Sequence, residues 1–421
     1  MNAHPDHIAY LVPRFPDLTH AFFWREVRAL RDAGITVDLV STLPPRKRFA
    51  SEGEHPFAGE ATRQTHYLGS DRIAGLAWLA THPQALARGF EYLGSLRESG
   101  TWEKLAVLAL FPAAANLCRL ASLRGFDRVH IHSCANAAHL GALANRFAGL
   151  DYSLTLHGDL PVYGKDHSRK MAGARFISTV TRPLREQVQQ VTGRSEKSVP
   201  VVTMGVDTDR FRPHHKGLFL AGPLRMLTVS RLIPQKGHAD AIEALGQLAN
   251  DGVDFHYTIV GDGPELVRLQ KLVRSAGLEN RISFPGRLGE DEVLATLRRS
   301  DVFLLPSFGL GEAAPVSVME AMACGLGVVC SRIGGTSDMI TDGVDGLLVP
   351  QRSPGRLAAS LRDLAFHRAR LIRLGKAARQ TAVKHFDYRA TASQLADCLS
   401  YPVRRTKSAA LPFLLTQATE S

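Results

Sequence analysis

The sequence lacks paired cysteines. Its five cysteines are scattered, odd in number and never arranged as C-x-x-C: Cys118, Cys134, Cys324, Cys330 and Cys398. This argues against a disulfide framework or a zinc knuckle and indicates a reducing compartment. The N-terminus lacks a signal-peptide pattern, and no stretch reaches the roughly 18 uninterrupted apolar residues of a membrane span. We therefore expect a cytoplasmic protein.

Two further absences narrow the function. No G-x-G-x-x-G follows the first predicted strand of either half, which argues against a Rossmann dehydrogenase. The chain carries a net charge of +11, but it has no aromatic-basic motif typical of nucleic-acid binding. The positive charge is then explained either by anionic substrates or by an anionic membrane surface.

The composition is that of a folded protein. Hydrophobic residues make up 45% and charged residues 22% of the 421 residues, values that are ordinary for globular chains. A chain of this length can form two domains of usual size, each with its own core.

Apolar strands alternate with helical patterns in the first half. The strands are predicted at 7–15, 36–43, 128–133, 152–157 and 175–180, with a helix at 19–33. This alternation predicts parallel β-α-β units, and so a Rossmann-like domain at 1–200. An insert at about 60–125 has helical periodicity throughout. It is either a set of helices packed on the sheet or, because it is both basic and apolar, a surface that sits on a membrane.

The second half repeats the alternation more regularly. Strands are predicted at 225–230, 255–260, 281–284, 301–305, 327–330 and 346–349. These predict a second doubly wound domain at 201–385, after a boundary near 195–220. The remainder, 386–421, is predicted as a C-terminal helix and tail that could return to the N-terminal domain.

Two turns after predicted strands carry groups suited to phosphates. Arg231 and Lys236 bracket the turn in SRLIPQKG, where an arginine and a lysine fit a diphosphate. The segment GDGPE follows the next strand, and the glycines at 261 and 263 flank Asp262, so that the backbone can approach a ligand closely. A strand-to-helix turn with solvated cations is the alternative interpretation.

The segment PSFGLGEAAPVSVMEAMACG, residues 306–325, is the richest in candidate groups. Pro315 is predicted as the first residue of a short helix. Glu312 then lies in the preceding loop, where its carboxylate could accept hydrogen bonds from sugar hydroxyls, and Glu320 lies on the helix, where it could hold a ribose. The free N–H groups near 314–317 could meet a phosphate.

Together these segments resemble family 4 of the retaining glycosyltransferases. Glu312 and Glu320 fit its E-x7-E signature, and the other motifs follow in order: RLIPQKG, GDGP, RISFPGRL, DVFLLPS and GGTSDMI, with MGVDTDRF and HGD in or near the first half. The match covers nearly the whole chain. The segments FPDLTHAFFWREVRAL and VHIHSCANAAHL further resemble exopolysaccharide and colanic-acid-type bacterial members.

The resemblance implies the GT-B fold, with two facing Rossmann-like domains, no metal requirement and retention of anomeric configuration. It implies a catalytic set of His157, Arg231, Lys236 and Glu312. It implies donor contacts at Gly261, Asp262, Gly263, Pro285, Gly286, Arg287, Ala314, Pro315, Val316 and Glu320. DLTH stands where many relatives have a glycine-rich loop. Thr19 and His20 of this segment, and Asp159 of the HGD segment, are candidates for acceptor or phosphate contacts.

Two patterns suggest a metal site. The D-x-D sequence of metal-dependent transferases occurs as Asp207–Asp209, but it belongs to the segment GVDTDRF near the domain boundary. His130, His132 and His139 are the second pattern, and we expect the alternating histidines to point to opposite faces, so that they cannot share one ion. We predict no metal and no cofactor apart from the donor substrate.

The sequence therefore predicts a hexosyltransferase-type enzyme. It would move a sugar from a nucleoside-diphosphate sugar to a saccharide acceptor, lipid-linked in related pathways, in surface polysaccharide biosynthesis. Such an acceptor is held at the inner face of the cytoplasmic membrane, and the protein could bind there peripherally. The alternatives are a nucleotide-sugar epimerase of the same fold and a non-catalytic sugar-binding partner in polysaccharide assembly.

Overall fold

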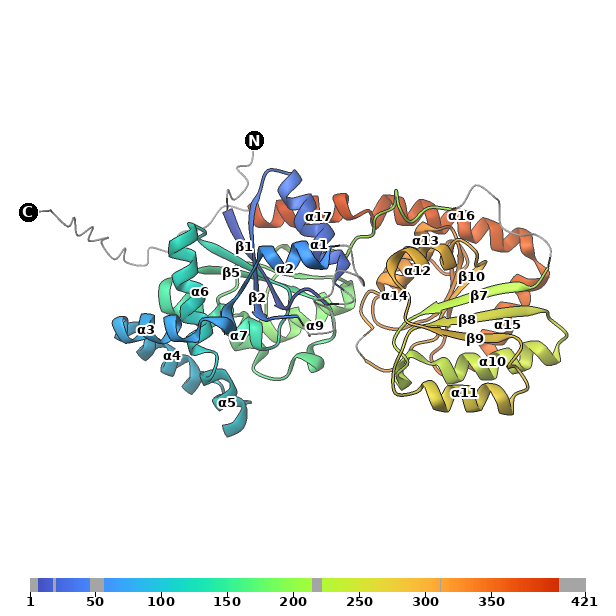
Figure 1. The fold of residues 1–421 in the computed structure, drawn as a ribbon, viewed down its shortest axis with the longest axis horizontal. Coiled ribbons are helices and arrows are strands. Elements are labelled where there is room, and N and C mark those ends of the chain that lie inside the picture. Colours follow the sequence, from blue (N-terminus) through green and yellow to red (C-terminus); the bar gives the residue numbers. More distant parts are fainter. Residues whose placement is uncertain (1–6, 18–19, 46–56, 214–221, 311, 401–421) are drawn as a thin grey trace, which may run out of the picture.

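Two six-stranded parallel sheets organise the chain. The computed structural model describes residues 7–17, 20–45, 57–213, 222–310 and 312–400. The first sheet has the strand order β3-β2-β1-β4-β5-β6 and the second has the order β12-β11-β10-β7-β8-β9. In both, the strand order reverses direction in the middle of the sheet, which defines a doubly wound topology. Figure 1 shows the two sheets in separate halves of the molecule, each with its own helices.

The elements of the first half agree with the predicted alternation. Its strands are β1 (His7–Arg14), β2 (Thr36–Leu43), β3 (Thr65–Tyr67), β4 (Arg128–Ile131), β5 (Asp151–Leu156) and β6 (Ile177–Thr179). Its α-helices are α1 (Ala21–Asp32), α2 (Ala58–Gln64), α3 (Arg72–Thr81), α4 (Pro83–Ser95), α5 (Thr101–Leu108), α6 (Phe111–Arg124), α7 (Asn136–Ala148), α8 (His167–Met171) and α9 (Arg182–Thr192). Short 3₁₀ turns at Leu68–Ser70, Leu160–Tyr163 and Glu196–Ser198 connect them.

Alternate residues of β1 enter two different cores. Ile8 and Tyr10 pack with the apolar face of α1, including Trp24. Ala9 and Leu11 point to the opposite face and join the core that contains α6 and α7. Because a central strand of a parallel sheet is covered on both sides, its sequence is apolar without interruption, as at residues 8–12.

The sequence analysis predicted that the insert at 60–125 is helical throughout, and this prediction was wrong. Residues Thr65–Tyr67 form β3, which pairs with the edge of β2. A three-residue strand carries too little alternation to be separated from a helical pattern. The rest of the insert is helical, and α6 packs between α3 and α7.

One helical stretch of the insert, Thr101–Arg124, is long and apolar enough to cross a membrane by length and composition. The structure divides it into α5 and α6, and 44% of its most apolar window is buried inside the protein. Buried core helices of soluble proteins often have this composition, so this stretch is only weak evidence for a membrane span.

The second half contains strands that lie within two residues of their predicted bounds. They are β7 (Leu224–Val229), β8 (Phe255–Val260), β9 (Ile282–Gly286), β10 (Val302–Leu305), β11 (Gly327–Ser331) and β12 (Leu347–Val349). The helices are α10 (His238–Asn250), α11 (Leu266–Ser275), α12 (Glu290–Leu297), α13 (Val316–Ala323), α14 (Thr336–Met339), α15 (Pro354–Phe366), α16 (Arg368–His385) and α17 (Tyr388–Ser400), with a 3₁₀ turn at Pro234–Lys236.

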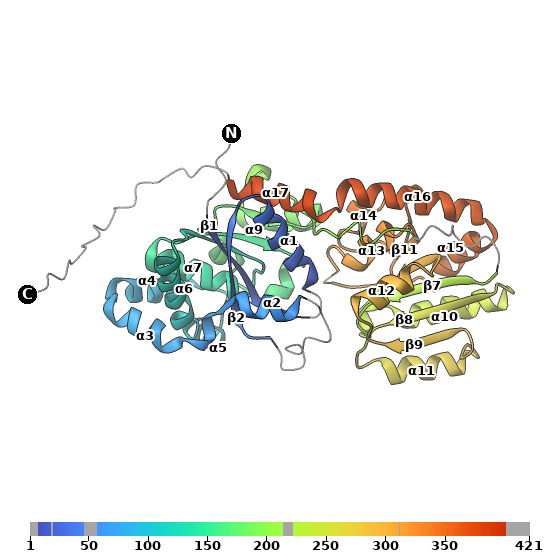
Figure 2. The same ribbon diagram turned by 45° about the horizontal axis from the view of Figure 1, so that its top comes forward.

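The last helix returns to the first half. In Figures 1 and 2, α16 runs along the second half and α17 continues over the first. Leu395 and Leu399 of α17 are buried in the same core as Ile8 and Trp24. The turn before α17 is held by the side chain of Asp387, which accepts a hydrogen bond from Thr208 Oγ1 at 2.6 Å. The two halves are thus tied together at the end of the described chain.

Candidate functional site

The loop after β7 brings two cations to the carboxyl edge of the second sheet. Arg231 is exposed, and Lys236 ends a 3₁₀ turn that leads into α10. Between this turn and α10, Gly237 has φ +69°, and a Cβ there would lie 1.9 Å from the carbonyl oxygen of Pro306. Only glycine allows this close approach, which holds the Lys236 turn against the end of β10.

Lys236 meets Glu312 across this edge. The Lys236 ammonium donates a hydrogen bond to Oε2 of Glu312, and Ser307 Oγ donates to the same oxygen at 2.8 Å. The Lys236 side chain is 17% and the Glu312 side chain 11% exposed. A carboxylate this buried requires a partner, and the ion pair provides it. The structure therefore brings together two of the four predicted catalytic residues.

The GDG loop packs directly on the segment that carries Arg231. Gly261 has φ +146°, and its missing Cβ would lie 1.9 Å from the carbonyl oxygen of Ser230. Gly263 has φ +159° and a similar approach, 2.3 Å, to the carbonyl oxygen of Leu232. The carbonyl of Asp262 accepts a hydrogen bond from the N–H of Leu232 at 2.9 Å. The two loops form one backbone surface at the ends of β7 and β8.

Three of the predicted donor contacts, at 285–287, lie beside this surface. Pro285 and Gly286 end β9, and Arg287 follows. The N–H of Gly261 donates to the carbonyl oxygen of Gly286 at 2.8 Å. The 285–287 segment and the GDG loop are therefore neighbours.

The helix that carries Glu320 begins one residue later than the sequence predicted. Pro315 is the N-cap, with φ −69° and ψ 113°, and α13 begins at Val316. Ala314, Pro315 and Val316 thus lie at the start of this helix. An offset of one residue is within the ordinary uncertainty of helix ends, and the proline still precedes the first turn.

Glu320 faces the other half of the molecule rather than Lys236. Burial raises the pKa of the Glu320 carboxyl to about 7, with Arg25 lowering it, Glu290 raising it and Arg210 lowering it. Arg25 belongs to α1 in the first half, and it forms an ion pair with Glu290, the first residue of α12 in the second half. Glu320 is therefore part of a charged group at the boundary between the two halves.

A second contact joins the two carboxyl edges. Arg182 at the start of α9 donates from its backbone N–H and its guanidinium to Asp338, at 2.6 and 2.9 Å. Next to this pair, a Cβ at Gly335 would lie 2.0 Å from the Thr181 methyl group. Thr181 follows β6 and Gly335 follows β11, so the ligand-binding edges of the two sheets meet at this point.

The first half contributes a cluster of buried imidazoles. His157 directly follows β5, and His132 follows β4; His132 Nδ1 and His157 Nε2 lie 3.1 Å apart. Burial lowers the pKa of His157 to about 3 and that of His20 to about 4. Asp159 is buried and accepts a hydrogen bond from Gln187 at 2.9 Å. Thr19 lies outside the described residues.

The expectation that the alternating histidines face opposite sides was wrong. The rings of His130 and His132 are 4.7 Å apart. Residues two apart on a strand point to the same face, because side chains alternate with a period of two. His139 lies elsewhere and bonds to Tyr92 at 2.7 Å. Both ring nitrogens of His130 have hydroxyl partners, Ser153 and Thr155.

The sequence analysis did not single out two residues of this cluster, Glu26 and Tyr10. Glu26 on α1 lies 3.3 Å from Nε2 of His132, and Tyr10 donates to Glu26 at 2.6 Å. The available signal was a glutamate inside the segment FFWREV, whose aromatic neighbours indicate a buried face.

The D-x-D sequence has a structural role. The carboxylate of Asp207 accepts hydrogen bonds from the N–H groups of Asp209 and Arg210 at 3.1 and 3.0 Å. Asp209 pairs with Arg389 at 2.9 Å. Within the described parts of the chain, no group of three histidine, cysteine or acidic side chains is arranged to hold a metal ion.

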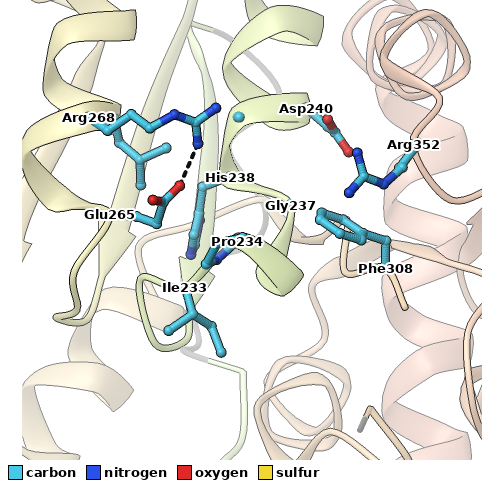
Figure 3. Close-up of a pocket in the computed structure, with 11 residues that line it drawn as sticks. Ile233, Pro234, Gly237, His238, Asp240, Glu265, Arg268, Phe308 and Arg352 are labelled. Atoms are coloured by element: carbon cyan, nitrogen blue, oxygen red, sulfur yellow. Dashed lines mark hydrogen bonds and ion pairs between the residues drawn. The ribbon is translucent and has the colours of Figure 1, made fainter. Parts of the chain in front are cut away.

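A small pocket lies on the other side of the Lys236 turn. It is lined by residues of this turn, of α10, of the start of α11 and of the loop after β12, among them Pro234, Asp240, Arg268 and Arg352. Figure 3 shows Arg352 beside Asp240 and over the ring of Phe308, with its guanidinium carbon 3.6 Å from the ring centre. None of the predicted site residues lines this pocket.

The chain is similar to known glycosyltransferases. Residues 210–381 match the family model described as "Glycosyl transferases group 1". The amylovoran biosynthesis glycosyltransferase AmsK of Erwinia amylovora is 29% identical over 415 residues, covering 93% of this chain and 98% of AmsK. The WcaL protein of Salmonella typhimurium, whose name refers to colanic acid biosynthesis, is 29% identical over 419 residues, covering 93% of this chain and 99% of WcaL.

Solved structures show the same fold. Anabaena HepE in complex with UDP and glucose has a TM-score of 0.71 at 18% identity, over 95% of this chain and 100% of HepE. A glycosyltransferase from Rickettsia africae has a TM-score of 0.69 at 17% identity, over 93% of this chain and 97% of that protein. The GT-B fold and the resemblance to these glycosyltransferases, both predicted from the sequence, are confirmed.

Proposed function

We propose that this chain transfers a sugar from a nucleoside-diphosphate sugar to a saccharide acceptor, since residues 210–381 match the model of the glycosyl transferases group 1 family. The proposal includes retention of the anomeric configuration and a place in exopolysaccharide biosynthesis. The relatives named for amylovoran and colanic acid biosynthesis support that place. The likeness to HepE, which was solved with UDP and glucose, supports a nucleotide-sugar donor.

The observation that carries the proposal is the group at the carboxyl edge of the second sheet. The exposed Arg231, the Lys236–Glu312 ion pair and the backbone of the GDG loop lie at the ends of neighbouring strands. Open parallel sheets bind ligands at this edge. Cations and glycine backbone suit a diphosphate, while a carboxylate and the Ser307 hydroxyl suit sugar hydroxyls.

The chemistry follows from these charges. The bond between the sugar anomeric carbon and the diphosphate oxygen breaks, so negative charge grows on the leaving group. Arg231 and Lys236 are fixed cations that would stabilise this charge more in the transition state than in the ground state. The acceptor oxygen attacks from the same face and gives its proton to the departing phosphate oxygen. In this scheme, no covalent enzyme intermediate and no metal ion take part.

Glu320 is proposed to hold the ribose of the donor. A carboxylate can accept hydrogen bonds from both ribose hydroxyls, as in dinucleotide sites. Because its pKa of about 7 is set mainly by burial, only part of the population is ionised at neutral pH. Nucleotide affinity should therefore rise with pH through this range.

The outer helices of the first half are proposed to bind the cytoplasmic face of an anionic membrane, where a lipid-linked acceptor would lie. Helices α3 and α4 lie at the end of the molecule farthest from the second half, and α5 lies at the lower edge of the first half (Figure 1). Their apolar side chains are unusually exposed: Trp102 is 84% and Ile73 82% exposed. Arg88 and Arg97 are exposed in the same helical region, and each cation near an anionic bilayer adds about 1 kcal/mol of binding.

Liposome co-sedimentation tests this surface. Neutralising Arg88, Arg97 and Lys104 together should reduce the bound fraction on anionic vesicles at low salt. The matched control neutralises three cations of α11, Arg268, Lys271 and Arg274, and should bind as the wild type does. Wild-type protein that stays in the supernatant at low salt would show that the insert only packs on the sheet.

Nucleotide binding tests the proposed donor site. Calorimetry with UDP and GDP should show binding of at least one nucleotide, weakened about 10- to 100-fold by Arg231→Ala or Lys236→Ala, since a charge-assisted contact contributes about 1.5–3 kcal/mol. The control variant, Lys271→Ala on α11, removes an exposed cation elsewhere in the same domain. Unchanged affinity in both site variants would refute the diphosphate role.

The two alternatives predict different products. An epimerase of the same fold would convert the donor sugar without any acceptor, whereas a transferase would release nucleoside diphosphate only as the acceptor is glycosylated. A non-catalytic sugar-binding protein would do neither and would tolerate the loss of Lys236.

A further inference from the structure

A line of polar groups connects α1 with His157 beneath the carboxyl edge of the first sheet. Tyr10 donates a hydrogen bond to Oε1 of Glu26 at 2.6 Å. Oε1 of Glu26 lies 3.3 Å from Nε2 of His132, and Nδ1 of His132 lies 3.1 Å from Nε2 of His157. Nδ1 of His157 is buried and has no hydrogen-bond partner among the described residues.

The contact between Glu26 and His132 is the loosest step. Nε2 of His132 makes no aligned hydrogen bond to any described residue, although its side chain is fully buried. A buried donor left without a partner is destabilising, because its desolvation is not offset by a hydrogen bond. A small rotation of either side chain would align this contact, and hydrogen bonds of functional sites are often loose before a ligand binds.

Both histidines are neutral, so their tautomers decide which atoms donate. Burial lowers the pKa of His157 to about 3 and lowers that of His132 well below its ordinary value. A neutral imidazole has one N–H donor and one acceptor nitrogen. Each hydrogen bond along the line therefore sets the direction of the next.

The carboxylate of Glu26 sets the first direction, because it can only accept. Nε2 of His132 must then carry the proton, which leaves Nδ1 of His132 as an acceptor. Nε2 of His157 donates to it, so that Nδ1 of His157 keeps its lone pair. A protonated Glu26 can donate as well as accept, and the order along the line is then no longer imposed.

We propose that Glu26 and His132 are positioning residues that hold Nδ1 of His157 as an acceptor for a hydroxyl of the sugar substrate. The proposal rests on the proposed function and on the resemblance described above, which implies a catalytic role for His157. Neither residue touches the sugar: both act through the imidazole of His157.

Three other titratable groups lie around the line, His130, His20 and Tyr163, and of these His20 has a buried ring nitrogen, Nδ1, with no hydrogen-bond partner among the described residues. His130 bonds to Ser153 and Thr155 with its two ring nitrogens. His20 packs edge-on against Phe23, and its pKa is lowered to about 4 by burial, although Asp17 raises it. Tyr163 uses its hydroxyl to accept the backbone N–H of His157 at 3.0 Å.

Ionisation of Glu26 makes the order testable by pH. Burial raises the pKa of Glu26 to about 7, and the hydrogen bond from Tyr10 opposes this rise. Above this pH, His157 should exist as the single Nε2–H tautomer. Below it, a mixture of the two tautomers is expected.

Nitrogen-15 spectra of the histidine-labelled full chain measure the tautomers directly, because protonated and lone-pair nitrogens have well-separated shifts. His157→Gln assigns the signals. In the wild type, the Nδ1 signal should move toward the lone-pair value as pH rises through about 7. Glu26→Gln should abolish this transition. Glu91→Gln, which removes an exposed carboxylate on α4, should leave the transition of His157 intact. The signals of His139 should not change in either variant.

Two variants of His132 separate positioning from packing. His132→Gln keeps one acceptor and one donor and should retain the wild-type tautomer of His157. His132→Phe removes both and should give mixed tautomers. In sugar transfer, His132→Phe should lower kcat/KM about tenfold, as expected for one hydrogen bond of about 1.4 kcal/mol, and His132→Gln should restore most of it.

The result that overturns the proposal is a pH transition of His157 that persists in Glu26→Gln, or a protonated Nδ1 in the wild type at pH 8. Equal losses of kcat/KM in both His132 variants would also overturn it, because packing alone would then explain them. Since the spectra need no substrate, they decide the order of the hydrogen bonds even if no transfer is found, which would instead refute the proposed function.

Discussion

Replacing Glu26 with glutamine should stabilise the first half of the molecule at alkaline pH. The Glu26 side chain is 14% exposed, and its pKa is raised from 4.5 to about 7, chiefly by burial. A group whose folded-state pKa is raised contributes stability below its unfolded pKa and loses it as pH rises through the folded pKa. At about 1.36 kcal/mol per pKa unit, ionising Glu26 in the folded state costs about 3 kcal/mol at pH 8 and less than about 1 kcal/mol at pH 5.

The variant should therefore gain about 2–3 kcal/mol relative to the wild type between pH 5 and pH 8. All three tryptophans, Trp24, Trp78 and Trp102, lie in the first half, so that urea unfolding followed by tryptophan fluorescence reports on this half. Glu91→Gln makes the same change of charge on the surface and serves as the control. If the gain from Glu26→Gln is equal at both pH values, or no larger than that of the control, burial of an ionised Glu26 is refuted.

Four further outcomes are expected. In a double-mutant cycle of Lys236→Met and Glu312→Gln, the coupling in unfolding free energy should be about 1.5–3 kcal/mol, and a value near zero would show that the pair is not formed in solution. Gly237→Ala should destabilise the second half by about 3 kcal/mol, because Gly237 has a positive φ and lies against the Pro306 carbonyl. Gly246→Ala in α10 has open space and should stabilise it by up to about 1 kcal/mol. Calorimetric melting that finds both variants neutral would contradict this. Nucleotide affinity should rise with pH through about 7 in the wild type and not in Glu320→Gln, so that parallel pH profiles would remove Glu320 from the ribose site. Transfer should persist in EDTA, and a loss that Mg²⁺ or Mn²⁺ restores would revive the D-x-D sequence as a ligand set.

The positions of most strands could be predicted from the sequence because these strands are buried on both faces. Segments such as 302–305 are continuous apolar runs between helices, and such runs occur mainly in central parallel strands. β3 was missed since three residues at a sheet edge carry no such run. The doubly wound topology then placed Arg231 and Lys236 correctly at a carboxyl edge.

The arrangement of the site was only partly predictable. The Lys236–Glu312 ion pair joins residues 76 positions apart, and their spacing in the sequence gives no sign of it. Arg25 and Glu320 meet only because the two halves are docked. Glu26 and His132 were not predicted to lie together, because burial of a polar side chain depends on tertiary contacts rather than on local pattern.

The central claim is that the carboxyl edge of the second sheet is a donor site for sugar transfer. The most direct test is the transfer of labelled sugar from a panel of nucleoside-diphosphate sugars to saccharide acceptors, with the wild type and Lys236→Ala measured side by side. Removing the contact to the leaving group should raise the barrier by about 2–4 kcal/mol, so we expect turnover by the wild type and a loss of about 30- to 1000-fold in the variant. Wild-type turnover that survives unchanged in Lys236→Ala would contradict the account.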